Sequence, residues 1–364
     1  MGWTKKASDF FKNPFRGGAG QAPAAADSSP LERVPRARPE VVRAETSVAL
    51  RGLFSATQVG GRAAPDGRAL SGEQQELAAR LSVMVLEHFR EHRLEMVSFP
   101  AMATQVIELA EQSDVDLGAL SHLIERDAAI AGKVLQVANS ALYHRGNEIP
   151  SIRGAVGHLG MFAVANIAVG VACRSLYDSD TRAEFDLYPK HWKEQFLQSM
   201  TVGFATSHFA SQHDMERGDH LFLAGMFHDV GKSLALRSLS RLVLDKKVAP
   251  CDEAVVDRVL EDTHVAIGVE AHHNWQLPEF LAELCAHHHD DEVPADSEHK
   301  DLHALRLVSG LNALRMMGEL ERPLKRQLKS SVRALGVSQA EVKDLSSDIR
   351  EANERTIEMF GMTA

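Results

Sequence analysis

The chain has 364 residues, 44% of them apolar, which is enough for one large or two ordinary domains with a substantial core. Its formal net charge of −10 is unevenly distributed: residues 1–70 contain eleven Lys and Arg but only six Asp and Glu, so residues 71–364 carry −15. A body this acidic repels phosphates, and we therefore expect no nucleic-acid partner.

The cysteine content and the apolar stretches bear on the cellular compartment. Cys173, Cys251 and Cys285 are odd in number and far apart, so neither a disulfide framework nor a Cys-rich zinc site is expected. The longest largely apolar stretch, 160–173, is interrupted by Asn166 and too short to form a transmembrane segment. The N-terminus also lacks the apolar segment of a secretory signal. These features predict a soluble, cytoplasmic protein.

The first 70 residues have the composition of a tail. Within residues 1–15, Trp3, Ala7, Phe10 and Phe11 share one helical face, which predicts a short amphipathic helix that docks on a partner or a membrane surface. The alternative is an unstructured leader, because isolated short helices are marginal in water. The rest of the segment is rich in Ala, Gly, Pro and Arg, and we expect residues 1–70 to be mostly disordered.

Regular helical patterns begin at Ser71. Ser71 and Gln74 form a capping-box pattern, and apolar residues follow at four-residue intervals, which predicts a leading helix within 71–98. Pro100 then opens a segment of three predicted helices, the second capped by Asp116 and the third by Asp127. Strand-type alternation is absent throughout, so the predicted fold class is all-α.

The stretch 219–232, DHLFLAGMFHDVGK, places the adjacent pair His228 and Asp229 at the end of an apolar helical run. An imidazole and a carboxylate offer nitrogen and oxygen ligands to a divalent metal, and Gly231 is expected to permit a sharp turn after them. Further ligands are available downstream at His264 and in the cluster 287–289. The alternative is a buried histidine that hydrogen-bonds to its neighbour, which is the commoner role of such a pair.

Several separated motifs together resemble the HDOD family, the HD-related output domains, which are all-helical relatives of the HD metal phosphohydrolases. The motifs are Phe99-Pro100, LSHLIERD at 120–127, KVLQVANS at 133–140, IPSIRGAVGHLG at 149–160, HDVGK at 228–232, and the segment 264–289 that ends in HHH. The resemblance implies a two-lobed helical HDOD domain over 99–301. Helices within 302–364 are expected to form a C-terminal extension.

The resemblance also implies which residues form the site. His228 and Asp229 match the HD pair, and His264 and His288 (with His289) match the further metal ligands, while Lys232 matches the lysine that meets a phosphate. Two positions depart from the pattern of the hydrolases. Gln198 stands where they have their first histidine, and Gly310 replaces the closing aspartate.

The departures decide between two functions. A catalytic metal wants at least three strong protein ligands and an open position for water, and Gln is a weak ligand while Gly is none. We therefore expect a non-catalytic signalling or scaffold module of bacterial signal transduction that acts through protein–protein contacts. Its degenerate pocket would require no cofactor but could sense a nucleotide or one divalent metal, Mn, Fe or Mg. The alternative is a metal-dependent phosphohydrolase or cyclic-nucleotide phosphodiesterase, with Asp229 and Lys232 in catalysis.

Overall fold

The computed structural model describes residues 70–92, 98–110, 116–140, 148–213, 215, 218–320 and 322–362. These residues form helices joined by turns and loops and contain no strand, which confirms the all-α prediction. The predicted tail and its docking helix at 1–15 lie outside the described residues.

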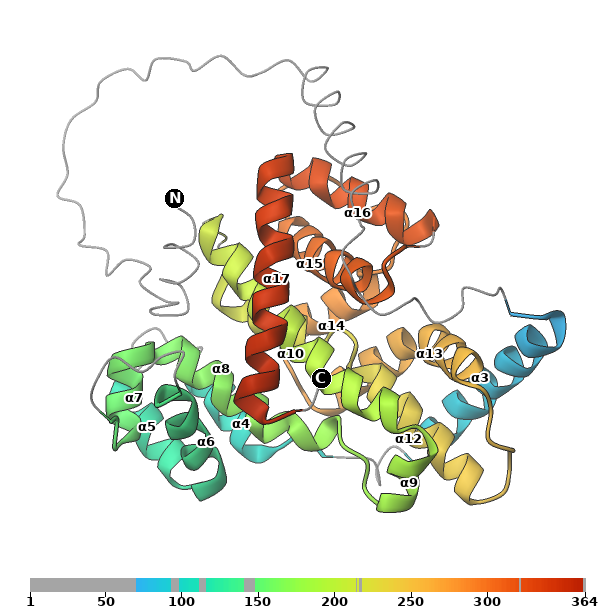
Figure 1. Cartoon of the computed structure of the whole chain (residues 1–364), viewed down its shortest axis with the longest axis horizontal. Helices are drawn as coiled ribbons and strands as arrows, with labels where there is room; N and C mark the ends of the chain where they lie inside the picture. Colours follow the sequence, from blue (N-terminus) through green and yellow to red (C-terminus); the bar gives the residue numbers. More distant parts are fainter. Residues whose placement is uncertain are drawn as a thin grey trace, which may run out of the picture.

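The first lobe is a small bundle of five helices, drawn in cyan to green in Figure 1. Its helix α8 is apolar on nearly all sides and packs against α4 and α6, so it forms the centre of the lobe. The helices are α4 (Ala101–Ala110), α5 (Leu117–Glu125), α6 (Ala128–Ala138), α7 (Ile152–Leu159) and α8 (Met161–Ala172). The 3-10 turn η1 (Cys173–Leu176) and α9 (Arg182–Leu187) then lead into the second lobe.

The second lobe contains the HD stretch. Helix α10 packs on α11, and α12 packs on α13, so the break between α11 and α12 is enclosed by longer helices. The leading helix α3 (Gly72–His92) packs against α12 and α13 and shares their separate apolar core. The other helices are α10 (Pro189–Gln212), α11 (Leu221–Phe227), α12 (Val230–Leu244), α13 (Glu253–Asn274) and α14 (Glu279–His287), with the 3-10 turn η2 (Gly218–His220) before α11.

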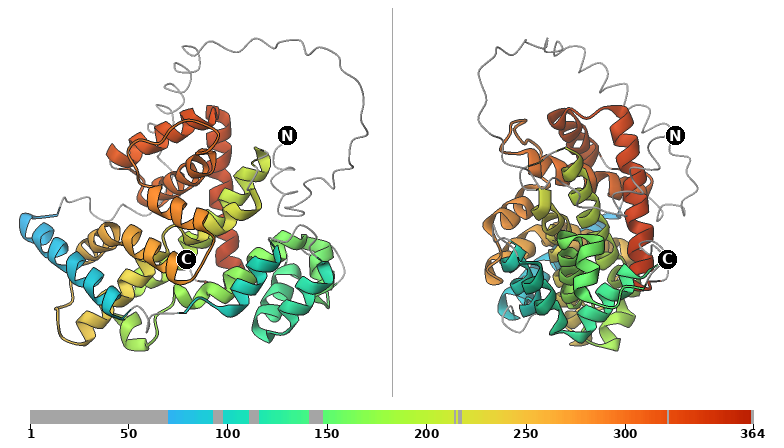
Figure 2. Two further views of the ribbon diagram at one scale, coloured as in Figure 1. Left: turned by 180° about the vertical axis from the view of Figure 1, so that it is seen from behind. Right: turned by 90° about the vertical axis from the view of Figure 1, so that its left-hand side faces the viewer.

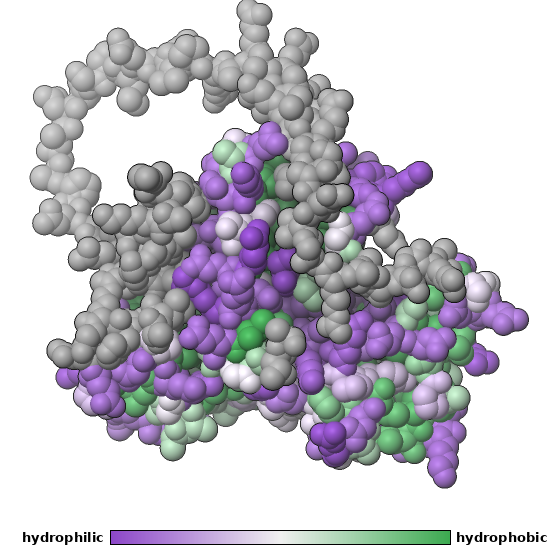
Figure 3. Space-filling model, in the orientation of Figure 1, coloured by the Kyte–Doolittle hydropathy of each residue, from purple (hydrophilic) through white to green (hydrophobic). Residues whose placement is uncertain are grey.

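Three C-terminal helices pack on this lobe: α15 (Lys300–Met317), α16 (Arg322–Leu335) and α17 (Gln339–Phe360). Helix α17 runs along α10 toward the first lobe, as Figures 1 and 2 show, and the ring of Phe360 at its end lies 4.8 Å from that of Phe196. The outward face of α17 is largely hydrophilic (Figure 3), which is expected of an amphipathic helix with one buried face.

The predicted helix starts are confirmed in detail. The Asp116 carboxylate accepts a hydrogen bond from Gly118 N, and that of Asp127 accepts from Ala129 N and Ile130 N. Ser71 and Gln74 bond reciprocally as a capping box ahead of α3. Local side-chain chemistry thus determines where these helices begin.

Among the described residues, no single helix is long and apolar enough to cross a membrane. One pair, α7 with the stretch Met161–Leu176, passes that test together by length and composition alone, and it is bent by 120°.

Candidate metal centre

His228 and Asp229 occupy the break between α11 and α12. All seven residues of α11 are buried, so the helix carries the pair into the interior, as the apolar run predicted. Gly231, however, lies inside the first turn of α12 and does not have a positive φ. A Cβ there would lie 2.8 Å from both the carbonyl carbon of His264 and the amide nitrogen of Gly268 on α13. The expected turn is therefore a correction: glycine is needed because two helix backbones meet.

Three histidine rings are oriented alike by backbone carbonyls. The Nδ1 atoms of His228, His264 and His288 lie 2.8 Å from Gly225 O, 2.9 Å from Glu261 O and 2.7 Å from Cys285 O, respectively. Each Nδ1 therefore donates its hydrogen, and each Nε2 keeps its lone pair. A backbone carbonyl that accepts from the other ring nitrogen and so fixes the tautomer is the usual arrangement of metal-ligating histidines.

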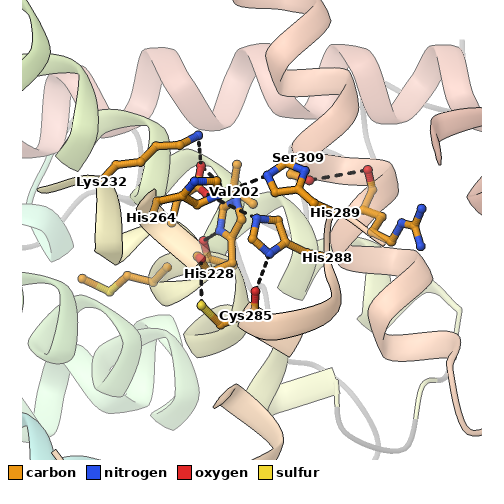
Figure 4. Close-up of polar contacts among 12 residues, drawn as sticks. Val202, His228, Lys232, His264, Cys285, His288, His289 and Ser309 are labelled. Carbon is orange, nitrogen blue, oxygen red and sulfur yellow. Dashed lines mark hydrogen bonds and ion pairs between the residues drawn. The ribbon is translucent and has the colours of Figure 1, made fainter. Parts of the chain in front are cut away.

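The rings of His228, His264 and His288 lie close together (Figure 4), and their Nε2 atoms converge on the Asp229 carboxylate. The Nε2 atoms of His264 and His288 each lie 3.4 Å from Asp229 Oδ1, and His289 Nε2 lies 3.1 Å from His264 Nε2. One ligand atom from each of these four residues lies within 4.8 Å of the others. His228 is at the edge of the group, with its Nε2 3.6 Å from Asp229 Oδ2.

Burial and charge determine the protonation of the group. Burial lowers the pKa of His228, His264 and His288 to about 4 each, so these imidazoles are neutral at pH 7. Burial alone would raise the pKa of Asp229, but the Lys232 ammonium and the surrounding histidines hold it well below its usual value. The centre therefore presents one carboxylate and several neutral imidazoles.

This donor set fits a divalent cation. Asp229 Oδ1 and His288 Nε2 are both buried, and neither has a hydrogen-bond partner among the described residues. Two acceptors that face each other at 3.4 Å repel unless a positive charge lies between them. Mixed imidazole and carboxylate ligands suit Fe²⁺, Mn²⁺ and similar ions, and Asp229, His264, His288 and His289 would bind the cation.

Two other helices present residues without strong ligand atoms. Figure 4 draws Val202 of α10 and Ser309 of α15 among the residues of the centre. Val202 follows Gln198 by one helical turn, and Ser309 directly precedes Gly310. Gly310 itself packs on α16, where its Cβ would lie 3.3 Å from Leu328 Cδ1. Val202 and Ser309 thus lie near the ligands, on the same two helices that carry Gln198 and Gly310.

The C-terminal helices support the turn that carries the paired histidines. The Gln327 side-chain amide on α16 donates to the carbonyl oxygen of His289, and the Arg306 guanidinium on α15 donates to that of Asp290 at 2.7 Å. Both side chains are nearly fully buried. Sequence reasoning missed these residues because their partners are backbone atoms of a distant turn, which leave no pattern in the sequence.

The structure is thus a lobed helical fold with a His-Asp centre whose ligands come from the α11–α12 break, α13 and the turn after α14. The HDOD domain model matches residues 96–291, more than half of the chain, and the chain belongs to the HDOD family. No match was found among curated proteins.

Solved structures agree with the fold. An HDOD domain protein with unknown function from Geobacter sulfurreducens is 20% identical and superposes with a TM-score of 0.56. The match covers 78% of this chain and 99% of the Geobacter chain. A provisionally named metal-dependent phosphohydrolase from Shewanella amazonensis SB2B is 21% identical, with 76% and 99% coverage and a TM-score of 0.54. A provisionally named signal transduction protein from Marinobacter aquaeolei VT8 is 20% identical, with 89% and 66% coverage and a TM-score of 0.52. At these identities the likeness establishes the fold alone.

Proposed function

We propose that the chain is a non-catalytic, cytoplasmic signalling or scaffold module that acts through protein partners and binds one divalent cation. The observation that carries the cation is the convergence of Asp229 Oδ1 with the lone pairs of His264 and His288, all in the protein interior. Membership of the HDOD family and the solved signal-transduction relative support the signalling role. Input would reach the module from a partner or through residues 1–70.

The helices opposite the centre argue against catalysis. Hydrolysis of a phosphodiester by a two-metal site needs ligands that hold both ions and stabilise the attacking and leaving oxygens. Val202 offers no ligand atom on α10, and Ser309 offers only a hydroxyl on α15. With these side chains the centre has strong ligands for one cation, so water activation and charge neutralisation would have to come from a single ion.

The alternative function, a metal-dependent phosphohydrolase or cyclic-nucleotide phosphodiesterase, has one observation in its favour. Lys232 is about one-fifth exposed and lies beside the carboxylate of Asp229, where its ammonium could meet a phosphate oxygen. That ammonium already has two carboxylate partners, Asp229 at 2.8 Å and Glu261 at 3.2 Å. A phosphate would therefore have to compete with both, which favours the non-catalytic function.

A turnover assay tests the proposal. The full-length protein would be loaded in turn with Mn²⁺, Fe²⁺ and Mg²⁺ and given nucleotides, cyclic dinucleotides and a chromogenic phosphodiester. We expect no hydrolysis above the level of an Asp229→Ala and a His264→Ala variant. Hydrolysis by the wild type that disappears in both variants would establish the phosphohydrolase instead.

A further inference from the structure

Glu261 belongs to the centre although no sequence motif assigns it a role. It lies on α13, three residues before His264, and its own backbone carbonyl accepts from His264 Nδ1. Its carboxylate contacts two further members of the centre, Lys232 Nζ at 3.2 Å and His289 Nε2 at 3.5 Å. Glu261 is thus connected to three of the residues that surround the cation position.

Lys232 creates a conflict that Glu261 can relieve. Its ammonium lies 2.8 Å from Asp229 Oδ2, on the same carboxylate whose Oδ1 faces His264 and His288. A divalent cation on Asp229 would therefore stand close to a second positive charge in a buried setting, where like charges repel strongly. Asp229 alone cannot neutralise both, because it carries one negative charge.

The geometry points to Glu261 as the counter-charge of Lys232. We propose that Glu261 is a positioning residue that binds the Lys232 ammonium when Asp229 coordinates a divalent cation, and that this second carboxylate strengthens binding of that cation. The inference rests on the proposed cation site. It requires no large movement, since Lys232 already lies within ion-pair distance of both carboxylates.

The neighbouring residue offers a matched control. Asp262 lies next to Glu261 on α13 and also carries one negative charge, but it pairs with Arg258 at 2.9 Å, not with Lys232. Asp262→Asn removes the same charge from the same helix turn. An effect of Glu261→Gln that Asp262→Asn does not reproduce is therefore specific to the contact with the centre.

The test is a titration of the metal-free full-length protein with Mn²⁺, followed by calorimetry and by the electron paramagnetic resonance of the free ion. Loss of a partner that orients a metal ligand typically weakens binding by about 10- to 100-fold, and we expect Glu261→Gln to raise the Kd for Mn²⁺ by at least about 10-fold. Asp262→Asn should change it by less than about 2-fold, a level expected for an exposed ion pair.

A Lys232→Met background separates the proposed role from direct ligation. Because Glu261 acts through Lys232, adding Glu261→Gln to the Lys232→Met variant should raise the Kd for Mn²⁺ by less than about 3-fold. The inference is wrong, while the cation site stands, if the single Glu261→Gln variant has an unchanged Kd for Mn²⁺. It is also wrong if Glu261→Gln raises that Kd as much in the Lys232→Met background as it does alone. A wild type that binds no Mn²⁺ refutes the cation site, and this inference with it.

Discussion

Gly231→Ala tests whether position 231 must be glycine because α12 and α13 approach each other closely there. The added Cβ would overlap the carbonyl oxygen of His264 and lie 2.8 Å from its carbonyl carbon and from the amide nitrogen of Gly268, whereas ordinary contact begins near 3.4 Å. Relieving the carbonyl-carbon contact alone would separate α12 and α13 by about 0.6 Å, and the overlap with the oxygen demands more, so the helices would forfeit a large part of their van der Waals attraction. The obstructing atoms are backbone, so no side-chain rotation relieves the clash.

Overpacking of this kind costs about 1–3 kcal/mol, and we expect the upper end because only the backbone can yield. For a protein of this size, with an unfolding entropy of about 2.1 cal/mol/K per residue, the upper end corresponds to a fall in Tm of about 4–5 °C. The matched control is Gly132→Ala in α6, where a Cβ meets nothing within 4 Å and alanine should be neutral or stabilising. Thermal unfolding followed by circular dichroism measures both. An unchanged Tm in Gly231→Ala would refute the close-approach explanation.

Three further predictions concern pH, the tail and the C-terminal helices. Burial lowers the pKa of His272 to about 4, against 6.5 in the unfolded chain, so the unfolded chain binds more protons between these two values. The stability that the neutral imidazole contributes is fully present above pH 6.5 and is lost as the pH falls below it. Between pH 7 and pH 5, the free energy of unfolding of a His272→Gln variant should therefore fall by about 2 kcal/mol less than that of the wild type. Urea unfolding at the two pH values measures both, and an equal fall in the two proteins would contradict this. Deleting residues 1–68 should leave the Tm nearly unchanged, because residues 1–15 are joined to the helical body only through a long Pro- and Gly-rich sequence; a drop of many degrees would show that the deleted residues pack on the body. Gln327→Leu should weaken Mn²⁺ binding by about 10-fold with the helical content preserved, and wild-type affinity would mean that the bond to the His289 carbonyl does not position the ligands.

The parts of the fold that depend on neighbours in sequence were predictable. Asp116 and Asp127 cap their helices because the carboxylate and the amides it accepts from are two or three residues apart. The helical class and the placement of His228 and Asp229 at the end of a buried helix follow from periodicity in the same way.

The parts that depend on distant contacts were not predictable. Gly231 faces a backbone carbonyl more than thirty residues away, and Gln327 donates to a turn 38 residues before it. The resemblance placed the departures at Gln198 and Gly310, but it does not give the rotation of α10 and α15 about their axes, which packing fixes and which brings Val202 and Ser309 near the centre.

The number of divalent ions bound per chain tests the central claim most directly. Native mass spectrometry of the full-length protein, saturated with Mn²⁺ and compared with His264→Ala, counts bound ions without reference to activity. The single-cation centre predicts one ion per chain in the wild type and none in the variant. Two ions in the wild type, or one ion that survives the loss of His264, would contradict it.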